Sequence, residues 1–232
     1  MDLAYFLNQR LAFVEYFHTG TTASFQEVKR KIEAGEPPYV DVRDPECVDE
    51  PAFFKEWEKA DAAMAITGAA CLDLLQSTLH AFLNEYMRQI GQERIIPQLG
   101  RLKQKSWLGN YKVFFQVYLQ IEWAASGADL DLLEQVILAR NDFTHNSDLF
   151  SFGAFQSLFH SEKHPDSAFA DPKWKTMLMQ RTPLSVPTET LHRAIETLRT
   201  LCEYLDHERY ALTKRRRIER KAKAPRNVSN SP

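Results

Sequence analysis

The sequence predicts an all-α fold, a helical bundle of long antiparallel helices preceded by an N-terminal helical extension. Hydrophobic residues make up 44% of the 232 residues, which is enough to bury a full core. Only eight residues are glycines, so long stretches run without a turn signal. In these stretches the apolar residues recur at the three- and four-residue spacing that is typical of amphipathic helices.

Residues 1–50 are predicted to form a helical hairpin and a loop. A first helix is expected over residues 2–18, and Gly20 is expected to end it, because glycine readily adopts the left-handed conformation of a helix C-terminus. A second helix starts at Ser24, with a glutamate three positions on that completes a capping box, and stops at Gly35. Prolines then indicate a loop.

Residues 51–213 are predicted to form the bundle itself. The longest helical pattern covers residues 52–90, as one bent helix or two, with Gly68 as the weak point. Residues 107–123 are apolar or aromatic on nearly all sides, which indicates a buried helix. This helix is expected to form an antiparallel pair with the one that follows it.

The second half of the bundle begins with an amphipathic helix from Leu130, capped by Asp129. Residues 147–186 are expected to form short helices and a loop, because glycine and prolines interrupt them, and Pro187 opens a last long helix. Residues 214–232 are predicted to form a basic, disordered tail that carries +7. Since the whole chain carries −2, the remainder carries −9.

The sequence also limits the class of protein. The N-terminus lacks the basic start and cleavage site of a signal peptide, and no uninterrupted apolar run has the length of a membrane span. The three cysteines, Cys47, Cys71 and Cys202, form no paired pattern. We therefore expect a cytoplasmic protein that has no contact with a membrane and no metal or other cofactor.

A polar cluster follows directly on the apolar face of the helix that begins at Leu130. Six polar residues surround a single phenylalanine: Arg140, Asn141, Asp142, Thr144, His145 and Asn146. A guanidinium is a permanent bidentate donor to phosphate oxygens, and an imidazole titrates near neutral pH, so the pair suits phosphate chemistry. In a regular helix Asn141 and His145 share a face, whereas Arg140 and His145 point about 140° apart. Arg140 must therefore reach with its long side chain, or the helix must loosen there.

Arg140, Asn141 and His145 resemble the signature of the HEPN superfamily, an arginine and a polar residue followed by a histidine after four to six intervening positions. The resemblance implies a small all-α domain that dimerises and brings two copies of the motif into one cleft. It implies catalytic roles for Arg140 and His145, supporting or substrate-binding roles for Asn141 and Asn146, and RNA as the substrate of a metal-independent endoribonuclease. It also implies a toxin or phage-defence effector, with an antitoxin-type protein partner.

Two other interpretations of the cluster remain open. HEPN-like modules that have lost catalytic activity bind nucleotide, RNA or a partner protein, and the acidic body of the chain disfavours RNA. In a purely structural interpretation, Arg140 and Asp142 form surface ion pairs and His145 caps the helix C-terminus.

Histidines elsewhere give a weaker hypothesis of a metal site. Glu-x-x-His occurs twice, at Glu15–His18 and at Glu189–His192, and this motif supplies ligands in di-metal bundles. Further carboxylates would come from Glu85, Glu122 or Glu134. One motif falls at a predicted helix end and the other at a helix start, which disfavours a site in the middle of a bundle. His160 and His164 are interpreted as solvated loop residues.

Overall fold

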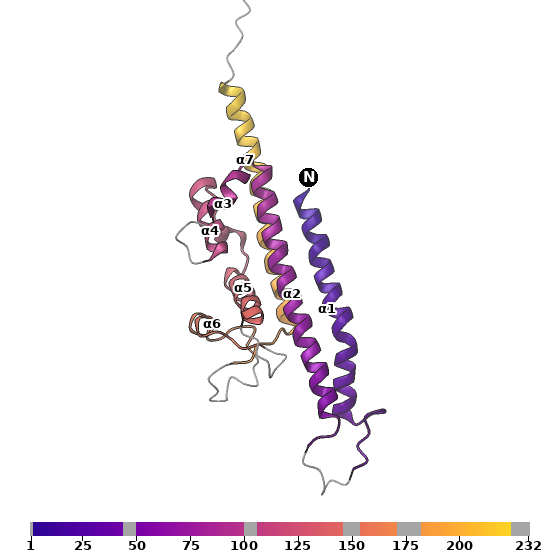
Figure 1. The fold of residues 1–232 in the computed structure, drawn as a ribbon. Coiled ribbons are helices and arrows are strands. Elements are labelled where there is room, and N and C mark those ends of the chain that lie inside the picture. The colour runs from indigo at the N-terminus through magenta and orange to yellow at the C-terminus, as the bar shows by residue number, and fades with distance from the viewer. Residues whose placement is uncertain (1, 44–49, 100–105, 146–153, 171–181, 224–232) are drawn as a thin grey trace, which may run out of the picture. The chain divides into compact units, whose positions relative to one another are not determined.

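The computed structural model describes five stretches of the chain: residues 2–43, 50–99, 106–145, 154–170 and 182–223, the last with backbone alone from 216 on. These stretches are predominantly helical and contain two isolated β-bridges but no β-strand, which confirms the all-α prediction (Figure 1). Two compact units divide the chain. The first unit comprises residues 1–7, 80–128 and 199–232, and the second unit comprises residues 8–79 and 129–198.

Helix α1 (Leu3–Ala34) is a single helix of 32 residues, so the prediction that Gly20 ends a first helix is wrong. Ser24 therefore lies inside the helix rather than at its start. One glycine in a helix interior costs only about 1 kcal/mol. Burial on both sides of Gly20 offsets this cost, since Val14 and His18 precede it and Thr22 follows it, all buried.

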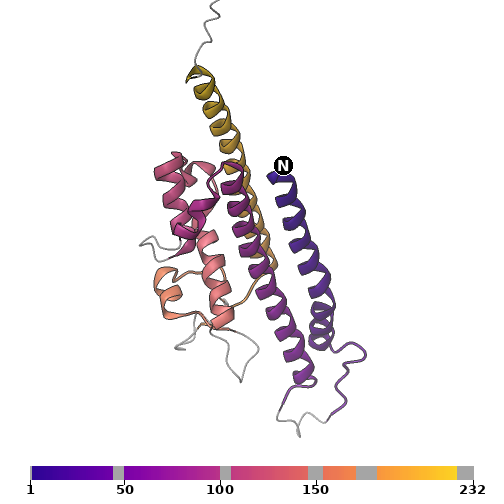
Figure 2. The same cartoon turned by 45° about the horizontal axis from the view of Figure 1, so that its top comes forward.

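Helix α2 (Phe54–Gln89) is continuous through Gly68. Within the second unit, three side-chain pairs join α1 to α2: Arg10 with Thr78, Lys29 with Asp61, and Glu33 with Trp57. Residue numbers on α2 fall as those on α1 rise, so these two segments run antiparallel (Figures 1 and 2). By length and composition, α2 is also the one described helix that is apolar enough to cross a membrane, a test that core helices of soluble proteins pass as well.

The core of the second unit draws on α1, α2, α5 (Leu130–His145) and the start of α7 (Thr188–Lys223). Its buried apolar side chains include Leu11, Val14, Leu72, Leu75, Leu132, Val136, Leu191 and Ile195. Asp129 accepts a hydrogen bond from the Leu132 amide at 2.9 Å, as predicted for the cap of α5. A short helix, α6 (Leu158–Lys163), packs beside α5.

The first unit is less regular than its sequence predicts. Helix α4 covers only Trp107–Phe114, and a π-helical turn, Phe115–Leu119, follows it. Gln120 then adopts a left-handed conformation with φ of 58°. The prediction of one buried helix over residues 107–123 is therefore wrong in its second half, where Val117 and Tyr118 are exposed. Short helical turns fill much of the remainder: η2 (Glu93–Ile95), α3 (Ile96–Leu99) and η4 (Trp123–Ser126).

Helix α7 continues to Lys223, so the first half of the predicted tail has a helical backbone. Residues 224–232 lie outside the described part of the chain.

Candidate functional site

The predicted site residues lie on the last turns of α5, which stays helical through His145. Asn141 is half-buried, whereas Thr144 and His145 are exposed. The Thr144 hydroxyl donates to the Arg140 carbonyl at 2.9 Å, a bond that a side chain makes within a regular helix. Because the helix does not loosen between residues 140 and 145, Arg140 and His145 keep the divergent directions expected for a five-residue separation. Asn146 lies outside the described residues.

Arg140 is held by an acidic residue of α2. Its Nε and Nη2 each lie 2.7 Å from Oδ1 of Asp73, and Nη1 donates to Oδ1 of Asn141 at 3.3 Å. A guanidinium has five N–H groups, so these contacts engage three of them. Asp73 is half-exposed, and the interaction is therefore a surface ion pair that fixes direction more than it adds stability.

Asn141 contacts one of the two predicted catalytic residues and shares a helical face with the other. It contacts the guanidinium of Arg140 and, four positions before His145, shares the face on which that imidazole lies. His145 is the last residue of α5. The last two turns of α5 thus carry a fixed cation and an exposed imidazole that point in divergent directions, with Asn141 on the face of the imidazole.

Asp142, at the centre of the motif, belongs to a different and buried cluster. Its Oδ2 lies 2.7 Å from Nδ1 of His160, and Nε2 of that imidazole lies 3.1 Å from Oγ of Ser167. All three residues are almost fully buried, with exposed fractions of 4% for Asp142, 0% for His160 and 2% for Ser167. The interpretation of Asp142 as a surface ion-pairing residue is therefore wrong, because the core of the second unit encloses it.

The order of the hydrogen bonds in this cluster is that of a serine-hydrolase triad, but its surroundings rule out that chemistry. Ser167 is buried, and its Oγ accepts a further hydrogen bond from the Phe169 amide at 3.2 Å. No substrate carbonyl has access to a hydroxyl held in this way. The cluster instead ties the helix that carries the motif to the 157–170 segment, and Ser157 adds a backbone hydrogen bond to Asp142 at 3.2 Å.

The prediction that His160 and His164 lie in a solvated loop is also wrong. His160 is on α6, His164 is its C-cap, and both are buried against α5. His164 lies 3.3 Å from Asp131 through Nδ1, and the neighbouring Lys163 lies 2.5 Å from Glu134. The four-residue spacing of the two histidines, which places both on one helical face, is the sequence signal that could have indicated this packing.

The two Glu-x-x-His motifs meet, although not as a di-metal site. Nδ1 of His192 lies 3.3 Å from Oε1 of Glu15, and burial and, to a smaller extent, His192 lower the pKa of His18. Among the described residues no group of three or more histidine, cysteine or carboxylate side chains is placed to hold a metal ion. Glu134 is engaged by Lys163, and Glu85 is engaged by a neighbouring arginine.

No family model matches this chain, and no curated protein or solved structure matches it.

Proposed function

We propose that the chain is a HEPN-like, metal-independent endoribonuclease that acts as a homodimer, with Arg140 and His145 as its catalytic residues. The observation that carries the proposal is the end of α5, where the guanidinium of Arg140 contacts the Asn141 amide and the exposed His145 lies four positions after Asn141, on the same helical face. In this proposal the protein is a cytoplasmic toxin or phage-defence effector with an antitoxin-type partner.

The chemistry needs no metal. A base removes the proton of a ribose 2′-OH as its oxygen attacks the adjacent phosphorus, and an acid protonates the 5′ oxygen that leaves. Histidine can fill either role near neutral pH. Arg140 would donate its remaining N–H groups to the phosphate oxygens, whose negative charge grows in the transition state. Asn141 would orient the guanidinium, and Asn146 is proposed to assist.

One chain supplies one such imidazole, whereas the reaction uses a base and an acid. A symmetric dimer solves this by placing His145 of both copies in one cleft. A mixture tests this feature: refolding equal amounts of wild type and His145→Ala should leave about a quarter of the wild-type activity, because only the dimer of two wild-type chains keeps both imidazoles. If the mixture instead keeps half of the wild-type activity, each chain acts alone.

The primary test is cleavage of single-stranded RNA in the presence of EDTA. His145→Ala and Arg140→Ala should each lower the rate by at least about 100-fold, the usual contribution of a general acid or base or of a charge-stabilising donor. His207→Ala is the matched control, since His207 is an exposed histidine of α7 with 82% of its side chain accessible. Wild-type protein that leaves RNA intact, or His145→Ala with an unchanged rate, would contradict the proposal.

The ion pair between Asp73 and Arg140 favours a second candidate function. The Asp73 carboxylate already neutralises part of the charge of Arg140, as suits a HEPN-like module that binds nucleotide, RNA or a partner protein without cleaving it. Binding of intact RNA or nucleotide that Arg140→Ala weakens, with no cleavage by the wild type, would favour this function. In both cases Asp73→Asn should tighten RNA binding by up to about fivefold, because it removes a competing surface charge.

A further inference from the structure

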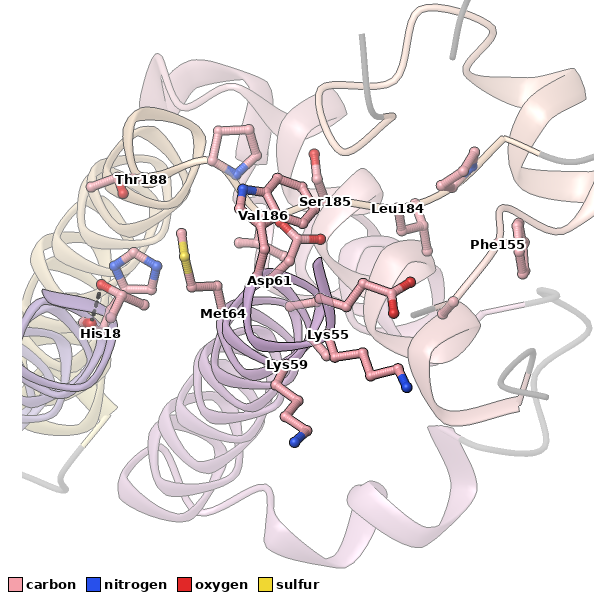
Figure 3. Close-up of a pocket in the computed structure, with 18 of the residues that line it drawn as sticks. His18, Lys55, Lys59, Asp61, Met64, Phe155, Leu184, Ser185, Val186 and Thr188 are labelled. Atoms are coloured by element: carbon pink, nitrogen blue, oxygen red, sulfur yellow. Dashed lines mark hydrogen bonds between the residues drawn. The ribbon is translucent and has the colours of Figure 1, made fainter. Parts of the chain in front are cut away.

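Helix α1 has two faces of different character. Its inner face is buried and includes Leu11, Val14, His18 and Thr22. Figure 3 shows the His18 imidazole projecting from α1 toward Met64 of α2, which fixes the direction of this inner face. Residues about half a turn away from His18, such as the exposed Gly20, therefore lie on an outer face that is turned away from α2.

The outer face of α1 carries exposed aromatic side chains. Four of them are more than half exposed: Tyr5 (56%), Phe6 (53%), Phe13 (55%) and Tyr16 (75%). Because α1 is one continuous helix, these four positions lie within about 100° of arc around its axis. Phe17 is half-buried beside them, and its ring stacks on that of Phe13 with the centroids 6.2 Å apart. A cluster of exposed apolar side chains of this kind marks an interaction surface.

The outer face is uncharged. Between Leu3 and Gln26 the residues with a permanent charge at neutral pH are Arg10 and Glu15, and both are engaged by neighbouring helices. The Arg10 guanidinium donates to the Thr78 hydroxyl of α2 at 3.4 Å, and Oε1 of Glu15 lies 3.3 Å from Nδ1 of His192 of α7. Nucleic acids and anionic lipid surfaces attract Lys and Arg side chains, which the outer face does not offer. It fits an apolar protein surface instead.

The two halves of the outer face differ in size. The half toward the start of α1 holds the four exposed rings, whereas the other half holds small exposed residues: Thr19, Gly20, Ala23 and Ser24. A Cβ added to Gly20 would meet no atom within 4 Å, so the surface is open there. A second copy of α1 laid antiparallel on the first places its rings over these small residues. With Phe6 opposite Gly20 of the second copy, the two-fold axis passes at Phe13.

The exposed rings are large enough for a contact between two copies. An aromatic side chain offers about 150–250 Å2, so four that are more than half exposed leave on the order of 500 Å2 of aromatic surface in water. Two copies that cover these rings would bury on the order of 1,000 Å2, which is the size at which specific protein interfaces begin.

We propose that the outer face of α1 binds the same face of a second copy of the chain, with the two helices antiparallel. In Figures 1 and 2, α2 lies between α1 and α5, so this contact is distinct from the meeting of two α5 ends that the proposed ribonuclease uses. The inference therefore does not rest on the proposed function. A chain that forms the α1 contact alone is a dimer, and one that forms both contacts assembles into a tetramer.

Sedimentation equilibrium of the full-length protein tests the α1 contact. The wild type should have the mass of a dimer or of a tetramer, and Phe13→Glu should halve this mass, because it places two carboxylates at the two-fold axis. The Kd of the contact should rise by at least about 30-fold, as for the loss of a central aromatic contact. Tyr210→Glu is the matched control, at an aromatic residue of α7 that is 58% exposed, and should leave the mass unchanged. Far-UV circular dichroism checks that each variant is folded.

Two further measurements test how the faces meet. Gly20→Leu adds apolar surface where the chain itself leaves open space, so it should keep the circular dichroism spectrum and yet abolish the α1 contact, because its side chain blocks the second copy. In a Cys47→Ser background, a short bismaleimide should cross-link Ala12→Cys into dimers but not Ala23→Cys. Ala12 lies next to the two-fold axis, whereas the two copies of Ala23 lie about 30 Å apart.

A wild type with the mass of a single chain, or Phe13→Glu with an unchanged mass, would overturn the proposal. Stronger association of Gly20→Leu would do the same, because it would show that the face is merely adhesive. Cross-linking of both cysteine variants would indicate a parallel pair, and cross-linking of neither would place the contact elsewhere, so each result contradicts the antiparallel arrangement.

Discussion

Gly20 and Gly68 both lie inside long helices, yet alanine should change stability in opposite directions at the two positions. A Cβ added to Gly20 meets no atom within 4 Å, so Gly20→Ala gains the helix propensity of alanine, about 1 kcal/mol. A Cβ added to Gly68 would lie 2.6 Å from Cβ and 2.9 Å from Cγ2 of Val186. Overpacking of a close contact costs about 1–3 kcal/mol, and at such short distances from Cβ and Cγ2 of Val186 we expect this cost to exceed the gain in propensity.

Urea unfolding followed by far-UV circular dichroism measures both effects. Gly20→Ala should raise the midpoint and Gly68→Ala should lower it, with unchanged slopes and a difference of about 1–3 kcal/mol in the free energy of unfolding between the variants. Adding Val186→Ala to Gly68→Ala should recover part of the loss by relieving the contact. The reasoning is refuted if Gly20→Ala destabilises the protein, which would mean that the chain leaves the helix there, or if Gly68→Ala stabilises it as much as Gly20→Ala does.

Three other predictions follow from buried groups. Asp142→Asn should lower the free energy of unfolding by about 3 kcal/mol, because it removes the charged partner of a buried imidazole, and urea unfolding measures this loss. Burial first, and His192 second, lower the pKa of His18 from 6.5, so the unfolded chain takes up this proton at a higher pH than the folded chain. Stability should therefore fall as the pH drops below 6.5, and unfolding curves of His18→Gln between pH 7 and pH 5 should show a smaller fall. Burial raises the pKa of the Cys71 thiol to about 11 and raises that of Cys202 well above its ordinary value, so peptide mapping after iodoacetamide treatment at pH 8 should find both labelled only in denaturant.

The helices with strong local signals could be predicted from the sequence. Helix α5 has an aspartate cap and a continuous apolar face, and α2 ends just before Gly91, which adopts a positive φ as a C-terminal glycine does. The error at Gly20 has a physical reason: a local stop signal of about 1 kcal/mol competes with the packing of a whole helix face, which the residues near Gly20 do not reveal. The π-helical turn after Phe114 likewise depends on packing around it rather than on helix propensity.

For the candidate site as well, one part could be predicted from the sequence and another part could not. The placement of Arg140, Asn141 and His145 on one helix end is local and could be predicted. Asp73 and His160 are 67 and 18 residues away from their partners on α5, and no spacing rule connects positions so far apart. The sequence does not indicate the partners of Asp142. For this reason the structure changed the expected role of Asp142 more than the role of any neighbouring residue in the motif.

Asp142 and His145 lie in the same short motif, but Asp142 is buried and His145 is exposed, so substitutions at the two positions should act differently. Asp142 anchors the end of α5 from inside the unit, through a buried bond to His160, while His145 is exposed beyond it. A loss of function in Asp142→Asn would therefore come with a loss of stability and should be recovered in part by lower temperature or by a stabilising second substitution. A loss in His145→Ala should occur at full stability, because an exposed side chain contributes little to folding. Measuring activity and unfolding together on the two variants separates the residue that holds the motif from the residue proposed to react.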